Sequence, residues 1–147
     1  MKATEGKLGR VFMLRLEEGD MIPDCIEKFA MDNNISTAHV SMLGTLMEGE
    51  IIVGPRKTSE NPPRPMDLPI YEAHETIATG VIAPDKDEKP ILHIHGALGR
   101  SGGTIMGCLR NGVKSWICCE VIVQEILGVH AKRLRDEKTG FTLLNLG

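Results

Sequence analysis

Three side chains in the second half of the chain are of types that bind transition metals: His93, His95 and Cys108. Residues two apart in a strand project from the same face, so His93 and His95 are expected to stand side by side. The glycine-rich residues 99–103 predict a hairpin, and a turn centred near Ser101-Gly102 places Cys108 opposite His95 on that face. Because zinc is bound by imidazole nitrogen and thiolate sulfur, the sequence predicts a site for zinc or another divalent transition metal. Its fourth position is left for water, a ligand or a substrate.

The predicted site depends on the register of that hairpin. A shift by one residue moves Cys108 to the far face, away from both imidazoles. Leu92 and Ile94 alternate with the histidines and are expected to fill the opposite, buried face. In the alternative interpretation, His93 and His95 are surface or hydrogen-bonded histidines and Cys108 is a small buried hydrophobe. Residue types and spacing leave both interpretations open.

Three further residues could transfer protons beside such a metal: Glu72, His74 and Glu120. Glu72 and His74 are two apart in a predicted strand, so they could form an acid/base pair or an outer shell for the metal. Next to an open coordination position, a carboxylate from this set could act as a proton shuttle for metal-activated water. A solvated strand face is the alternative interpretation. No phosphate loop, serine nucleophile elbow or dinucleotide motif is present, and the sequence leaves open whether the chain is an enzyme.

Apolar spacing predicts one helix and several strands around these residues. A helix is expected to begin at Asp20, which can cap it, and to close at Asn33-Asn34. Residues 54–69 hold five prolines and are typical of a surface loop. Strands are expected within residues 10–16, 36–53 (two strands), 70–83, 91–98, 104–110, 115–127 and 142–144.

This order of elements predicts an α+β fold, a curled and mainly antiparallel sheet packed on one principal helix. The pattern lacks the strand-helix alternation of a parallel sheet. A length of 147 residues suits a single domain over residues 1–147. With only one clear helix, one face of the sheet would stay uncovered, which favours packing against another subunit.

Charge and hydropathy exclude several classes of partner. The net charge is −3 and no block of Lys and Arg occurs, so strong direct binding to nucleic acid is not expected. A small basic cluster around His130 and Arg133 is typical of solvated surface. Apolar runs are far shorter than the roughly 20 residues that span a bilayer, so no membrane segment is expected. The first residues lack the apolar run of a secretory signal, which predicts a cytoplasmic location.

Several motifs occur together along the chain. They are residues 12–20 (FMLRLEEGD) before the helix, residues 34–40 (NISTAHV) leading to Leu43-Gly44, Tyr71-Glu72, His93-Ile94-His95 with its glycine-rich hairpin, and residues 136–140 (DEKTG). In these features, from about Gly9 to Leu144, the chain resembles the PPC domain, also called DUF296. That domain is found in bacterial and archaeal single-domain proteins and in plant AT-hook nuclear proteins.

The resemblance implies an α+β fold on an antiparallel sheet and assembly as a homotrimer. Prokaryotic members often carry His-x-His followed, after the hairpin, by Gly-Gly-His, and those three histidines look like a metal site. By this resemblance the ligands are His93, His95 and Cys108, with Met106-Gly107-Cys108 in place of Gly-Gly-His. A second departure is His74, where the family usually has an aliphatic residue.

Two functions from different classes follow. The first is a trimeric PPC-type domain protein whose open-coordination His/His/Cys zinc site acts on, or senses, a small molecule. The alternative is an interaction or regulatory protein, because prokaryotic members are often labelled DNA-binding by analogy with the plant proteins. Those plant proteins contact DNA through separate AT-hooks that this chain lacks. A cupin-like metalloenzyme shares the His-x-His pair but expects a Glu a few residues on, and residues 96–99 offer none.

Overall fold

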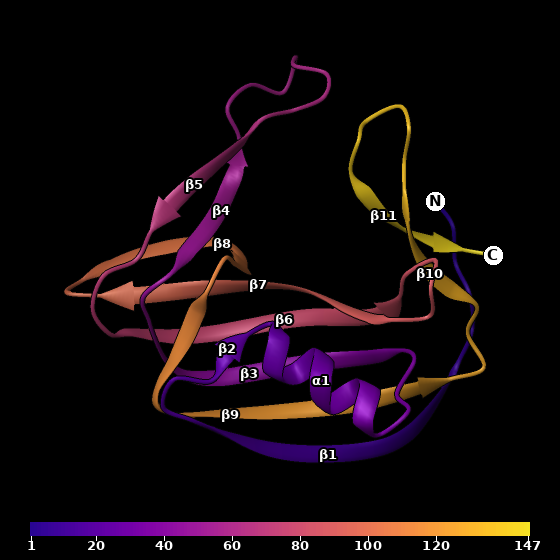
Figure 1. Cartoon of the computed structure of the whole chain (residues 1–147), viewed down its shortest axis with the longest axis horizontal. Helices are drawn as coiled ribbons and strands as arrows, with labels where there is room; N and C mark the ends of the chain where they lie inside the picture. The colour runs from indigo at the N-terminus through magenta and orange to yellow at the C-terminus, as the bar shows by residue number, and fades with distance from the viewer.

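The computed structural model describes residues 1–147 as a large curled sheet with one short helix across one face (Figure 1). The strands of this sheet are β1 (Lys7–Glu17), β2 (Met21–Ile22), β3 (Ala38–Met47), β4 (Glu50–Pro55), β5 (Pro65–Pro69), β6 (His74–Pro84), β7 (Pro90–Arg100), β8 (Gly103–Arg110) and β9 (Val113–Leu127). They lie in the order β1-β9-β3-β6-β7-β8-β4-β5, with β2 pairing to β9. All neighbouring pairs are antiparallel. The predicted mainly antiparallel sheet with one principal helix is confirmed.

One face of the sheet is the core and packs against helix α1 (Asp24–Asp32). Along β7 the residues Leu92, Ile94 and Leu98 are buried, whereas His93 and His95 between them are exposed. This is the period of two that the sequence predicts for a strand with one buried face. The two histidines therefore lie on the outer face. The chain has no helix of the length and apolar character that crossing a membrane requires.

The outer face carries a second apolar surface that nothing in this chain covers. Met13, Ile122, Ser41, Thr79, His95 and Cys108 form one cross-strand row over six strands. The neighbouring row holds Leu43, Ile77, Ala97 and Met106. We call the exposed apolar side chains of these rows and of β1 the open face: Val11, Met13, Leu43, Ile77, Met106 and Ile122. Exposed patches of this kind mark association surfaces.

The helix begins later than its sequence predicts. Met21 and Ile22 pair with β9, and the Asp20 carboxylate accepts a hydrogen bond from the Glu17 amide (2.9 Å) rather than capping a helix. Pro23 is the residue before the first turn and its carbonyl accepts from the Ile26 amide. The backbone of Met21 and Ile22 is in the extended conformation of a strand paired with β9, so these residues cannot form the first turn of the helix. The predicted end at Asn33-Asn34 is confirmed.

The predicted loop over residues 54–69 is partly wrong, because its last residues form β5. This strand pairs with β4 at the edge of the sheet, where a proline that lacks an N–H is tolerated. Residues 56–64 remain a loop. The prediction of a loop depended on the five prolines alone, and prolines exclude a central strand but allow an edge strand.

A separate hairpin of β10 (Ala131–Arg135) and β11 (Thr142–Leu146) follows β9. The predicted final strand is confirmed, but the interpretation of the preceding basic cluster as solvated surface is wrong for Arg133. That side chain is only 6% exposed. Its Nε and Nη2 donate to the carbonyls of Ile91 (3.2 Å) and Val81 (2.8 Å), so it docks the hairpin on β6 and β7.

One nearly buried carboxylate ties the first strand to the sheet. Glu125 accepts three hydrogen bonds from Arg10, from its amide, Nε and Nη2, and these lower the pKa of Glu125 to about 2. A depressed folded-state pKa contributes stability above the unfolded value, and that stability is lost as the pH falls toward the folded value. The pair should therefore stabilise the fold at neutral pH and lose this effect between about pH 4.5 and pH 2.

Glu125→Gln is expected to lower the free energy of unfolding at pH 7 by about 1–2 kcal/mol, because Arg10 is half-exposed and solvent screens part of the interaction. The difference from the unmodified chain should shrink as the pH falls below about 4.5. Urea unfolding across this pH range measures it. Glu17→Gln is the matched control, since the Arg15–Glu17 pair is exposed and should be worth less than about 0.5 kcal/mol. An unfolding difference that stays constant with pH would contradict the assignment.

Candidate metal centre

The hairpin of β7 and β8 has the register that the sequence predicts. Ser101 and Gly102 both have positive φ (51° and 81°), as a two-residue turn between twisted strands requires. Arg100 pairs with Gly103 across this turn, and five residues further along His95 pairs with Cys108. Opposed residues of an antiparallel pair share a face, so the thiol lies on the same side as the two imidazoles.

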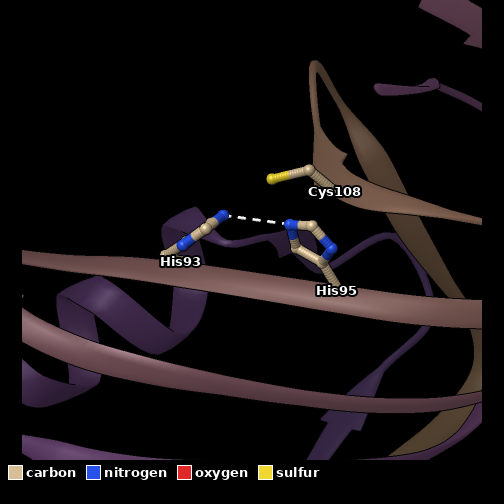
Figure 2. A group of neighbouring side chains, drawn as sticks. All are labelled: His93, His95 and Cys108. Carbon is tan, nitrogen blue, oxygen red and sulfur yellow. Dashed lines mark hydrogen bonds between the residues drawn. The ribbon is translucent and has the colours of Figure 1, made fainter. Parts of the chain in front are cut away.

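The three side chains converge on one point above the sheet (Figure 2). The Nε2 atoms of His93 and His95 are 3.0 Å apart, and one donates a hydrogen bond to the other. The two rings lie edge to face with their centroids 4.8 Å apart. One ligand atom from each of His93, His95 and Cys108 lies within 4.8 Å of the other two. No other group of three or more His, Cys, Asp or Glu side chains in the chain converges in this way.

The surroundings keep one imidazole in the form that a metal requires and place a hydrogen-bond donor beside the sulfur. Burial, the positive charge of Arg133 and the neighbouring His95 lower the pKa of His93 to about 4, so its imidazole is neutral at neutral pH. Cys108 is buried, and its Sγ accepts a hydrogen bond of 3.2 Å from Nε of Arg110. Neutral imidazole and thiolate are the forms that bind zinc.

The donor set fits a tetrahedral zinc ion. Two nitrogens that each lie about 2.0–2.1 Å from such an ion are about 3.3 Å from each other. The two Nε2 atoms, at 3.0 Å, are close to this separation already. The sulfur is within side-chain rotation of both, and three protein ligands leave one position of the tetrahedron open.

A pocket of about 500 Å³ opens directly over the three donors. Its floor is the outer face of β7 and β8, and its walls come from β4, β5 and the β10–β11 hairpin. The lining residues are Ile52, Gly54, Pro55, Pro65, His93, His95, Cys108, Arg110, Gly140, Phe141, Thr142 and Leu143. A second hollow of about 540 Å³ shares His93, His95, Thr142 and Leu143 with it and adds Arg133. The donors are thus reached through a recess rather than from a flat surface.

Glu72 and His74 do not reach this pocket. Glu72 precedes β6 and has a φ of 65°, so it is outside the strand on which the two were expected to share a face. His74 Nδ1 bonds the backbone carbonyl of Glu72 at 3.0 Å, not its carboxylate. The predicted acid/base pair is therefore not formed. His74 pairs with Leu46 at the start of β6, five residues before Thr79, which is the partner of His95.

Glu120 lies on the outer face but far from the three donors. It pairs with Leu43 of β3, and β3 and β6 separate its strand from β7. Three steps of about 4.8 Å place the backbone of Glu120 roughly 14 Å from β7. The structure brings none of Glu72, His74 and Glu120 to the metal donors, and we assign them no role there.

Sequence reasoning missed the two arginines beside the donors. Arg110 could have been found, because it is two residues after Cys108 and must share its face. Arg133 carries no such signal, since it arrives from a separate hairpin. His39 also lies on this face, where its ring nitrogens bond Gln124 (3.1 Å) and Thr79 (3.0 Å), so it is a hydrogen-bonded neighbour of the site rather than a ligand.

Fold and donors together define the class: a curled antiparallel-sheet protein with a candidate His-His-Cys metal centre on its outer face. Residues 3–127 match the family model of the Plants and Prokaryotes Conserved (PCC) domain. The chain belongs to this family, which confirms the resemblance to the PPC domain. No curated protein matches the chain in sequence.

Solved structures from archaea and bacteria share this fold. The metal-containing protein of Archaeoglobus fulgidus is 31% identical, with 97% of this chain and 98% of that chain covered and a TM-score of 0.83. The plant- and prokaryote-conserved (PPC) protein of Pyrococcus horikoshii is 25% identical, with 99% and 97% covered and a TM-score of 0.85. A protein of Bacteroides thetaiotaomicron, provisionally described as DNA-binding, is 17% identical over 96% and 97%, with a TM-score of 0.78. Identity this low shows the fold alone.

Proposed function

We propose that this chain is a zinc protein in which His93, His95 and Cys108 hold one metal ion and a small molecule binds at the remaining position. The observation that carries the proposal is the convergence of three donors of the types that zinc prefers, at the floor of a pocket. When bound, zinc supplies a Lewis acid at an open coordination position. The Archaeoglobus fulgidus protein is described as metal-containing, which supports a metal-binding role for this chain.

The chain's own residues shape what happens around the metal. Arg110 holds the sulfur of Cys108 in position through its Nε–H, and Arg133 fixes the β10–β11 hairpin over the pocket. Phe141 and Leu143 of that hairpin segment line the recess. A small molecule in the pocket would therefore lose much of its contact with water, which is the usual setting for a ligand or substrate site.

Metal analysis of the purified protein tests this proposal. After exposure to zinc and exhaustive dialysis, the protein should retain about one zinc ion per chain, because a tetrahedral site with three protein ligands takes a single ion. Atomic absorption gives the stoichiometry, and anomalous scattering at the zinc edge gives the position. Protein that retains no zinc, or zinc located away from the three donors, would overturn the proposal.

We further propose that the chain assembles with copies of itself, as a homotrimer, through the open face. The number of three chains is what the resemblance to the PPC domain implies. The support for association itself is physical: six exposed apolar side chains lie on one face of the sheet, where water would otherwise contact them. Copies of the chain supply the same apolar surface and so can bury it mutually.

A further inference from the structure

The pocket over the three donors has an unusual balance of charge. None of the residues that line it, or the hollow beside it, is Asp or Glu. Two arginines, Arg110 and Arg133, are among the lining residues. Neither forms an ion pair with a carboxylate, although seven ion pairs occur elsewhere in the chain. No carboxylate therefore lies within ion-pair distance of either guanidinium, and the carboxylate of Glu27 acts on Arg133 only from beyond that distance.

Each arginine still has hydrogen-bond donors to offer. Arg110 is exposed and uses only its Nε–H, on the sulfur of Cys108, so its two terminal nitrogens are free. Arg133 is buried and uses Nε and Nη2 on backbone carbonyls. Its Nη1 has no acceptor in the protein and is not fully buried, and Arg133 is one of the residues that line the hollow. A guanidinium fork of this kind suits a carboxylate.

A bound metal ion would add further positive charge to the pocket. A divalent ion held by one thiolate and two neutral imidazoles keeps a net charge of about +1. With two guanidinium groups beside it, the centre is strongly positive in a partly enclosed recess, where Coulomb attraction is less screened than in water. Apolar side chains also line this recess, among them Phe141, Leu143 and Pro65.

From this arrangement we infer that the pocket takes a small organic carboxylate. Its charged end lies at the metal and Arg110, and its apolar body lies against Phe141 and Leu143. This inference rests on the proposed function, because the metal is one of the partners of the carboxylate. It narrows the ligand from any small molecule to a monoanion with an apolar body that fits a pocket of about 500 Å³.

Calorimetry with benzoate as the probe tests the inference on the zinc-loaded protein. Benzoate should bind at least about tenfold more tightly than benzyl alcohol, which has the same ring without the charge. It should also bind more tightly than inorganic phosphate, which has charge but no apolar body. Arg110→Gln should weaken benzoate at least about tenfold, and Arg110→Lys should restore part of the loss. Arg100→Gln is the matched control, an exposed arginine of β7 outside the pocket, and should change nothing.

The zinc content of each sample is measured in parallel, so that two failures can be told apart. Zinc that binds normally while benzoate binds no better than benzyl alcohol overturns the carboxylate inference and leaves the proposed function standing. Phosphate that binds as tightly as benzoate also overturns it, because the apolar side chains then select nothing. A chain that holds no zinc overturns the proposed function. Arg110-dependent benzoate binding to that metal-free protein would support a carboxylate ligand held by Arg110 without the metal, and no benzoate binding would overturn the carboxylate inference as well.

Discussion

Replacing Cys108 with serine, or either His93 or His95 with alanine, is expected to weaken zinc binding by at least about 100-fold. Loss of an outer partner of a metal ligand already costs about 10- to 100-fold in affinity, so loss of a ligand itself should cost more. Competition with a chelator of known affinity measures the change. Because all three side chains project from the outer face of the sheet, the core beneath them is untouched and each variant should fold.

Cobalt provides a second readout that assigns the sulfur. Co²⁺ bound by a thiolate gives a charge-transfer band in the near ultraviolet, and Cys108→Ser should abolish this band while the histidine variants reduce its intensity through weaker binding. The matched controls are Cys118→Ser and His130→Ala, which remove an exposed thiol and an exposed imidazole elsewhere in the chain. If a control variant lost the metal as the Cys108 variant does, the ion would have to lie at another place. Equal zinc affinity in the His95 variant and the unmodified chain would contradict the assignment of His95 as a metal ligand.

The candidate centre could be predicted because its information is local. Two histidines two residues apart, a turn with glycine at the required position and a cysteine six residues after that turn lie within residues 93–108. Strand period and hairpin pairing convert these spacings directly into a shared face. The register His95 to Cys108 depends only on the turn at Ser101-Gly102, which the structure confirms.

The rest of the site is not local, and sequence reasoning failed there for that reason. Arg133 belongs to a hairpin that docks on β6 and β7 through two backbone carbonyls, and no pattern near residue 133 specifies those partners. The predicted start of the helix was wrong for the same reason. Asp20 is a residue type that often caps a helix, but the next residues, Met21 and Ile22, pair with β9 instead. Glu72 and His74 were expected to share a face, but the backbone at Glu72 adopts a positive φ and leaves the strand.

The open face could have been predicted from the spacing of apolar residues along its strands. In a strand with one buried face, polar residues should alternate with apolar ones. β6 instead places Ile77 outside, beside the buried Thr76 and Ala78, and β9 places Ile122 outside between the buried Val121 and Val123. Apolar residues on both faces of neighbouring strands are typical of a sheet that is covered on both faces, which is why we propose association through the open face. Helix α1 covers one face, and no element of this chain covers the other at Ile77.

Replacing Ile77 with glutamate is therefore expected to convert the assembled protein to single chains. Ile77 is 74% exposed and lies between Leu43 and Ala97 in a continuous cross-strand row, so it stands inside the open face rather than at its rim. Burying an isoleucine stabilises by about 1.5–3 kcal/mol, and burying an unpaired carboxylate costs several kcal/mol more. A change of about 3 kcal/mol at each interface lowers an association constant more than 100-fold.

Light scattering at micromolar concentration distinguishes the outcomes. The unmodified chain should have three times the 16.1 kDa mass of one chain, and the Ile77→Glu protein should have the mass of one chain. Circular dichroism should stay unchanged, because the substituted side chain contributes little to the core of its own chain. Met31→Glu, at an exposed position on α1 away from the open face, should remain assembled. An unmodified protein that is already monomeric, or an Ile77→Glu protein that keeps its mass, would show that copies of the chain do not cover this face.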